Sequence, residues 1–321
     1  MAKSKNDKPE LLMRAIKAVH GVFVDEEAVT PEALEKQRTA QERFSTFITP
    51  GNKITTETFY IEGMEAEWVK PEFAHDTRRV ILYSHGGGFT CGGINYARIL
   101  AGKLAIATGL EVLSYAYRLA PEHPFPAQIG DAQKVWDYLM LRGFGADHVY
   151  LAGDSAGGNL SLELCLRLKQ MNRMLPRAMV LMSPWTDMTL SGKSYEKNKL
   201  KDPTITMGYV RAVRSAYTPK KEAPELPEDR KNDDKKSDLY RSPEYSPLYA
   251  DLSGMPSALI QAGSLEVLRS DSESLLKQYR KYGSFAKIEI YRRGWHVFQL
   301  LPTPMAAEAM EHIGQFIQEH K

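Results

Sequence analysis

The chain has only two cysteines, Cys91 and Cys165, among 321 residues. Two cysteines are too few for a disulfide framework, and neither stands in a C-x-x-C pattern that would predict a metal site. Long apolar runs are also missing, so no membrane span is expected. The start of the chain, MAKSKNDKPELLMR, lacks the apolar core of a signal peptide. We therefore expect a cytoplasmic protein without a metal site or a membrane partner.

An excess of charge of one sign is likewise absent, because 42 lysines and arginines oppose 40 aspartates and glutamates. This balance gives no electrostatic reason to expect nucleic acid or an anionic membrane as a partner. Hydrophobic residues make up 43 % of the chain, which is enough to bury a globular core. The length predicts one large domain with a smaller appendage.

From residue 79 onward, short apolar segments alternate with segments of helical character. We expect strands at 80–84, 111–117, 148–153, 178–183, 257–263 and 286–292, and helices at 95–108, 126–142, 156–171, 267–282 and 303–319. Residues 53–70 alternate in polarity and predict further strands with a turn at Gly63. This alternation predicts an α/β fold with a mostly parallel sheet and helices on both faces.

Two stretches do not follow the strand–helix rhythm. Residues 9–45 have a helical period, and Pro31 is expected to open the second of two helices there. Residues 188–250 predict no strand, and their middle, 219–238, is too charged and proline-rich to join a core. We expect N-terminal cap helices in residues 1–50 and a catalytic domain in 51–321. The apolar parts of the 188–250 insertion are expected to complete the cap.

The motif GDSAG at 153–157 lies between a predicted strand and a predicted helix. This is the context of a nucleophile elbow, G-x-S-x-G, in which a tight turn exposes the serine hydroxyl. Gly153 and Gly157 remove side chains that would clash across such a turn. The alternative is a glycine-rich turn with a capping serine. We favour Ser155 as a nucleophile because a second motif agrees with it.

That second motif is HGGG at 85–88, directly after the predicted strand 80–84. Acyl transfer places negative charge on a carbonyl oxygen, which backbone N–H groups can stabilise. We expect these donors to be Gly87 and Gly88, together with Ala156 after the nucleophile. A phosphate-binding loop would carry a Lys-Ser or Lys-Thr pair after its glycines, which is absent here. His85 is expected to brace the loop.

A serine nucleophile needs a base that works near neutral pH, and an acid to orient that base. His296 lies between the last predicted strand and the last predicted helix, where hydrolases of this chain order place the base. His123 precedes the nucleophile and does not fit that order. Glu266 is the first carboxylate after the strand 257–263, and Asp271 follows within the next helix. We favour Glu266 as the acid and keep Asp271 as the alternative.

Several motifs occur in an order that resembles the hormone-sensitive-lipase-like branch of the α/β-hydrolases. They cover about residues 55–320: HGGGF at 85–89, YRLAPEHPFPA at 117–127, GDSAGGNL at 153–160, SPWTD at 183–187 and WHVF at 295–298. The resemblance implies an eight-stranded, mainly parallel sheet, a helical cap, no cofactor, and a serine carboxylesterase for short- to medium-chain acyl esters. Related enzymes often form homodimers, so we expect a small-molecule ester as ligand and a homodimer as one option.

This chain departs from the family at the acid, where Glu266 replaces the first aspartate of a D-x-L-x-D motif. Within YRLAPEHPFPA, we expect Arg118 and Glu122 to pair and Asp131 to support the same region. We expect three bulky side chains to line the substrate pocket: Phe89, Trp185 and Tyr209.

Other functions remain open at this point. An amidase or deacetylase would use the same triad, and a lipase acting at lipid interfaces would need an apolar lid rather than a charged insertion. A ligand receptor on a hydrolase scaffold belongs to a different class, because fold does not determine function. Such a receptor usually lacks a catalytic residue, whereas all are present here.

Overall fold

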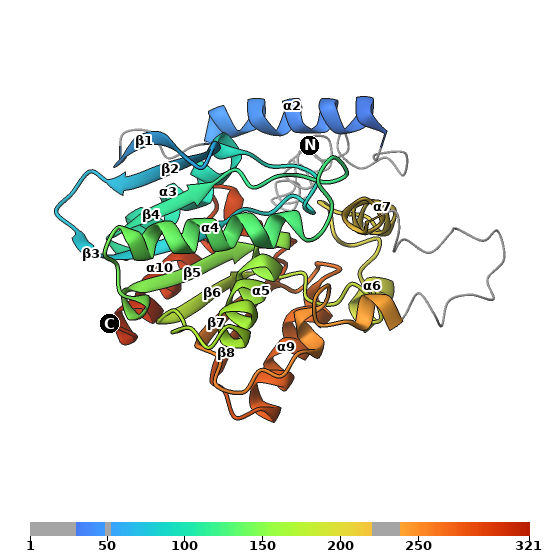
Figure 1. Cartoon of the computed structure of the whole chain (residues 1–321). Helices are drawn as coiled ribbons and strands as arrows, with labels where there is room; N and C mark the ends of the chain where they lie inside the picture. Colours follow the sequence, from blue (N-terminus) through green and yellow to red (C-terminus); the bar gives the residue numbers. More distant parts are fainter. Residues whose placement is uncertain (1–29, 49–52, 220–237) are drawn as a thin grey trace, which may run out of the picture.

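The computed structural model describes residues 30–48, 53–219 and 238–321 (Figure 1). Eight strands form one sheet in the order β1-β2-β4-β3-β5-β6-β7-β8. Their bounds are Ile54–Ile61 (β1), Met64–Pro71 (β2), Asp76–Ser84 (β3), Leu110–Tyr115 (β4), Val149–Asp154 (β5), Ala178–Met182 (β6), Ser257–Gly263 (β7) and Ala286–Tyr291 (β8).

The sheet is parallel from β4 through β8, and only β1 and β2 run antiparallel to their neighbours. β1 and β2 form a hairpin whose turn contains Gly63 at φ 82°, a conformation that favours glycine. The predicted α/β-hydrolase fold with an eight-stranded, mostly parallel sheet is therefore confirmed.

Helices cover both faces of the sheet, so every residue of β5 and β6 is buried. α3 and α10 pack on one face and α4, α5 and α9 on the other, each with its own apolar cluster (Figure 1). The helix bounds are Pro31–Ile48 (α2), Ile94–Thr108 (α3), Ala127–Leu141 (α4), Ala156–Gln170 (α5), Lys193–Lys197 (α6), Met207–Tyr217 (α7), Arg269–Lys281 (α9) and Pro304–Glu319 (α10). Burial on both faces explains why the predicted strands read as nearly continuous apolar runs.

α2 begins at Pro31, as predicted, because proline is favoured in the first turn of a helix. The described part of the 188–250 insertion contains α6, α7 and a 3₁₀ turn at Pro247–Tyr249, and no strand. The first predicted N-terminal helix and nearly all of the charged 219–238 segment lie outside the described residues. Across the described ranges, no helix is both long and apolar enough to cross a membrane. The domain boundaries at residues 50 and 51 stay a prediction.

Candidate active site

Ser155 occupies the sharp turn between β5 and α5. Its backbone has φ 52° and ψ −119°, a strained conformation for a residue with a side chain. A Cβ atom at Gly153 would lie 2.2 Å from the carbonyl oxygen of Gly157, and one at Gly157 would lie 2.0 Å from that of Ser84. Both glycines are therefore required by the close packing of this turn, and the elbow has the predicted geometry.

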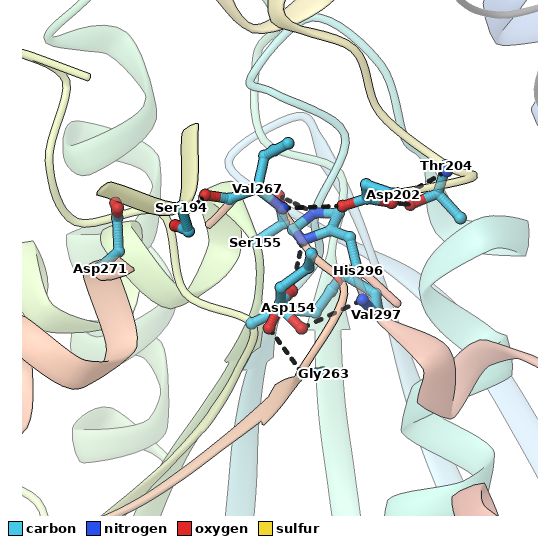
Figure 2. A network of polar contacts seen from close by, with 12 residues as sticks. Asp154, Ser155, Ser194, Asp202, Thr204, Gly263, Val267, Asp271, His296 and Val297 are labelled. Atoms are coloured by element: carbon cyan, nitrogen blue, oxygen red, sulfur yellow. Dashed lines mark hydrogen bonds and ion pairs between the residues drawn. The ribbon is translucent and has the colours of Figure 1, made fainter. Parts of the chain in front are cut away.

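Ser155, His296 and Glu266 form one chain of hydrogen bonds, and Figure 2 shows Ser155 and His296 within the surrounding polar network. The Nε2 atom of His296 lies 2.9 Å from the Oγ of Ser155, and its Nδ1 lies 3.1 Å from the Oε2 of Glu266. The other carboxylate oxygen of Glu266 accepts a hydrogen bond from the N–H of Gly263 at 2.7 Å. Three residues that are far apart in sequence are thus held in line, with the imidazole between hydroxyl and carboxylate.

Asp271, the alternative acid, lies in the first turn of α9 and does not contact His296. Its Oδ2 accepts hydrogen bonds from the backbone N–H groups of Thr186 and Asp187, both at 2.9 Å. Burial raises the pKa of Asp271 well above its usual range, and nearby Asp187 raises it further. Asp271 therefore anchors the SPWTD loop, whereas the carboxylate that contacts His296 is that of Glu266.

The charge on Glu266 controls the protonation of His296. Burial alone would lower the pKa of the imidazole, but the hydrogen bond to Glu266 and its charge outweigh burial. Asp202 and Asp154 add smaller contributions in the same direction. The pKa of His296 is raised as a result, which favours the imidazolium form that a proton-accepting base must adopt.

The HGGG loop faces the same site. Gly87 and Gly88 line a pocket together with Ser155 and His296, and both have positive φ angles, 107° and 63°. A Cβ at Gly87 would meet the carbonyl oxygen of Cys91 at 2.3 Å, so this position requires glycine. Ala156 follows Ser155 at the start of α5, where helix N–H groups point outward from the first turn. Gly87 and Gly88 therefore line the same pocket as Ser155, and Ala156 directly follows the serine in the chain.

His85 braces this loop, as expected. Its ring stacks on Tyr117 with centroids 4.1 Å apart, and its Nδ1 lies 2.7 Å from the carbonyl oxygen of Gly86. Complete burial lowers its pKa to about 4, so the ring is neutral at physiological pH. A ring with so low a pKa is a poor proton acceptor.

Asp154 is a supporting residue that the sequence analysis missed. Its Oδ1 accepts hydrogen bonds from the hydroxyl of Tyr83 at 2.5 Å and from the N–H of Gly86 at 2.8 Å, and its Oδ2 accepts one from Tyr96 at 3.3 Å. One carboxylate beside the nucleophile thus holds the glycine loop. Its position inside the GDSAG motif was the only available signal.

The predicted ion pair between Arg118 and Glu122 is wrong. The guanidinium of Arg118 pairs with Asp131 of α4 at 2.9 Å, so the predicted support from Asp131 is confirmed. Glu122 pairs instead with Arg38 of α2 at 2.8 Å, and Arg38 also donates to the carbonyl oxygen of Thr90 at 2.8 Å. Glu122 faces α2 because the chain turns between Arg118 and Glu122. Arg38 thereby links α2 to the segment that follows the HGGG motif.

An apolar pocket opens above Ser155 between α2 and α7. Its volume is ≈ 100 Å³, and α2 contributes Gln37 and Gln41 while α7 contributes Tyr209, Val210 and Val213. Trp185 also lines the pocket, so two of the three predicted lining residues are confirmed.

The expectation for Phe89, the third of these residues, is wrong. Phe89 is fully buried behind the pocket and stacks on Tyr217 with centroids 4.0 Å apart. The backbone φ of Phe89 is 62°, directly after the glycines of HGGG. The sequence alone does not predict this backbone conformation, which turns the side chain away from the pocket.

Cys91 and Cys165 are both buried free thiols. Among the described residues, no three His, Cys, Asp or Glu side chains group in a way that could hold a metal ion. The site brings together a hydroxyl, an imidazole and a carboxylate.

Comparisons with known proteins agree with this arrangement. A family model described as alpha/beta hydrolase fold matches residues 81–300. An esterase of Acinetobacter venetianus is 32 % identical over 258 residues, which are 80 % of this chain and 79 % of that protein. An acetyl-hydrolase of Streptomyces hygroscopicus is 32 % identical over 293 residues, 90 % of each chain. The crystal structure of an esterase from the bacterial hormone-sensitive lipase family matches with a TM-score of 0.82 at 31 % identity, covering 100 % of this chain and 99 % of that one.

Proposed function

Because this chain belongs to the α/β-hydrolase fold family, in its hormone-sensitive-lipase-like branch, we propose that it uses Ser155, His296 and Glu266 to hydrolyse short- to medium-chain acyl esters. The observation that carries this proposal is the hydrogen-bond chain from Ser155 through His296 to Glu266 at the floor of an apolar pocket. Relatives named esterase and acetyl-hydrolase support the same reaction class.

In the acylation step, the Oγ of Ser155 attacks the ester carbonyl while the Nε2 of His296 takes the hydroxyl proton. Glu266 holds the Nδ1–H of the imidazole, which fixes the tautomer whose Nε2 is free to accept. The imidazolium that forms lies beside the buried carboxylate of Glu266, which stabilises its charge. His296 then gives the proton to the leaving alcohol, and the acyl group stays on Ser155.

The backbone N–H groups of Gly87, Gly88 and Ala156 stabilise the tetrahedral oxyanion in this mechanism. Their positions are set before substrate binds, because Asp154 holds Gly86 and the cap holds Thr90. Preorganised donors of this kind lower the barrier without reorganising during the reaction. Water then repeats the attack on the acyl-enzyme, with His296 as the base, and releases the acid.

The first test is a series of p-nitrophenyl esters from acetate to palmitate. The pocket of ≈ 100 Å³ has little room, so acetate and butyrate esters should be hydrolysed about tenfold or more faster than palmitate. Release of p-nitrophenol at 405 nm, expressed as kcat/KM, measures the profile, and a matched p-nitroanilide series tests amide cleavage. Amides hydrolysed faster than esters would contradict the proposed preference, and a folded protein without turnover would contradict the function.

The pH dependence tests the base. His296 accepts a proton only when neutral, so kcat/KM should fall as the pH drops through its pKa. The hydrogen bond and charge of Glu266, together with the charges of Asp202 and Asp154, outweigh burial and raise this pKa from its usual value of 6.5, so the midpoint of the acid limb should lie above pH 6.5. Initial rates between pH 5 and 9, corrected for spontaneous hydrolysis, measure it. A flat profile over this range would exclude a histidine base.

The cytoplasmic location and the homodimer stay predictions. The buried free thiols of Cys91 and Cys165 are consistent with a reducing compartment. Cell fractionation and size-exclusion chromatography with light scattering measure the location and the oligomeric state.

A further inference from the structure

The segment from Ser194 to Thr204, in the 188–250 insertion, lies against the loop that carries Glu266 (Figure 2). Asn198 donates its side-chain N–H groups to the carbonyl oxygens of Ser264 and Glu266, at 3.3 and 3.0 Å. The hydroxyl of Ser194 donates to the carbonyl oxygen of Val267. Backbone groups on both sides of the Glu266 side chain are therefore held by side chains of the insertion.

Asp202 holds a backbone donor of the same loop. Its Oδ2 accepts a hydrogen bond from the N–H of Val267 at 3.0 Å, and its Oδ1 accepts from the N–H and hydroxyl of Thr204 at 3.0 and 2.7 Å. Thr204 itself lines the substrate pocket. One buried carboxylate, 6 % exposed, thus joins a wall of the pocket to the residue that follows Glu266.

The charge of Asp202 also reaches the imidazole. Three carboxylates act on His296: Glu266 by direct hydrogen bond, and Asp202 and Asp154 through space. All three raise the pKa of His296, whereas burial lowers it. Burial raises the pKa of Asp202 itself, while the charge of His296 and the hydrogen bonds from Thr204 and Val267 oppose that rise. The negative charge of Asp202 therefore becomes more favourable when His296 is an imidazolium.

A purely structural role in accepting these hydrogen bonds would not require the negative charge of Asp202. Burying a carboxylate is costly, and three neutral donors could be satisfied by a neutral acceptor. An anion near a base that becomes cationic in the transition state stabilises that state.

We propose that Asp202 is a positioning residue for the triad, which fixes the Glu266 loop through Val267 and supplies a second negative charge to His296. This inference rests on the proposed esterase function. The proposal gives the 188–250 insertion a supporting role in the reaction. The Asp202 carboxylate binds both Thr204 in the pocket wall and the loop that carries Glu266.

The test compares Asp202→Asn with Thr204→Val. The asparagine keeps the shape and removes the charge, and its NH₂ group must face either Val267 or Thr204, so one backbone hydrogen bond is lost. We expect kcat to fall about ten- to a hundredfold with KM nearly unchanged. The acid limb of kcat/KM should move to lower pH, because the imidazolium loses a stabilising charge. Thr204→Val removes one donor to Asp202 but keeps the carboxylate, so the acid limb should move less than in Asp202→Asn.

A wild-type acid limb in Asp202→Asn, or a loss confined to KM, would overturn the proposal. Thermal unfolding shows whether each variant is folded. Should Asp202→Asn prove unstable, Asp202→Ser places no NH₂ group against the donors and must shift the acid limb in the same direction. The pH dependence of Ser155 phosphonylation by a fluorophosphonate gives the same limb without ester turnover. A wild type that hydrolyses no ester therefore defeats the proposed function, while an unshifted phosphonylation profile defeats the role of Asp202.

Discussion

Replacing Ser155 by alanine should reduce kcat for p-nitrophenyl acetate by a factor on the order of 10⁴ or more. In the described part of the chain, Ser155 carries the hydroxyl that contacts the Nε2 of His296, at 2.9 Å. Glycine-loop donors and the pocket would persist in the variant, so a small residual rate above that of water is expected from oxyanion stabilisation and binding alone. When deacylation limits turnover, stopped-flow kinetics should show a burst of p-nitrophenol for the wild type and none for Ser155→Ala.

Two controls accompany this variant: its thermal unfolding and its labelling by a fluorophosphonate. Ser155 is 9 % exposed, and alanine fits the same turn, so the unfolding temperature should change little. A fluorophosphonate should add its mass to the wild-type peptide containing residues 153–157 and leave Ser155→Ala unlabelled. Activity of Ser155→Ala within tenfold of the wild type would reject this residue as the nucleophile.

The parts of the site that the sequence predicted best were those tied to local motifs. Ser155 lies in a five-residue pattern whose glycines are required, because a Cβ atom at either one would lie 2.0–2.2 Å from a carbonyl oxygen. His296 and Glu266 follow the ends of strands, and parallel strands bring their carboxyl ends to the same edge of the sheet. Chain order and strand position were therefore enough to place three distant residues within hydrogen-bond distance.

The parts that sequence reasoning missed depend on contacts between distant elements. Arg118 and Glu122 are close in sequence, yet they pair with Asp131 and Arg38 from two different helices. Asp202 lies in a segment without periodicity, so nothing local marked it as a neighbour of the Glu266 loop. These ion pairs and hydrogen bonds depend on how α2 and the 188–250 insertion pack on the sheet and its helices. No local sequence pattern predicts that packing.

Replacing Glu266 by glutamine should lower kcat by a factor on the order of 10⁴. The side chain keeps its size, and its carbonyl oxygen can still accept the N–H of Gly263. Its NH₂ group would then face the Nδ1 of His296 and donate to it, which places the imidazole proton on Nε2. In that tautomer Nε2 donates to Ser155 and cannot take its proton. The kcat of Glu266→Gln, with KM close to that of the wild type, measures this effect.

Asp271→Asn is the matched control for this variant. Burial and the nearby charge of Asp187 raise the pKa of Asp271, and asparagine keeps the shape of its side chain. Its Oδ2 accepts two backbone N–H groups, and the amide oxygen can do the same, so kcat should stay within about tenfold of the wild type. Glu266→Asp should retain partial activity, because a carboxylate one methylene shorter still fixes the correct tautomer. The opposite ranking, with Asp271→Asn inactive and Glu266→Gln active, would make Asp271 the acid and require a different arrangement of His296.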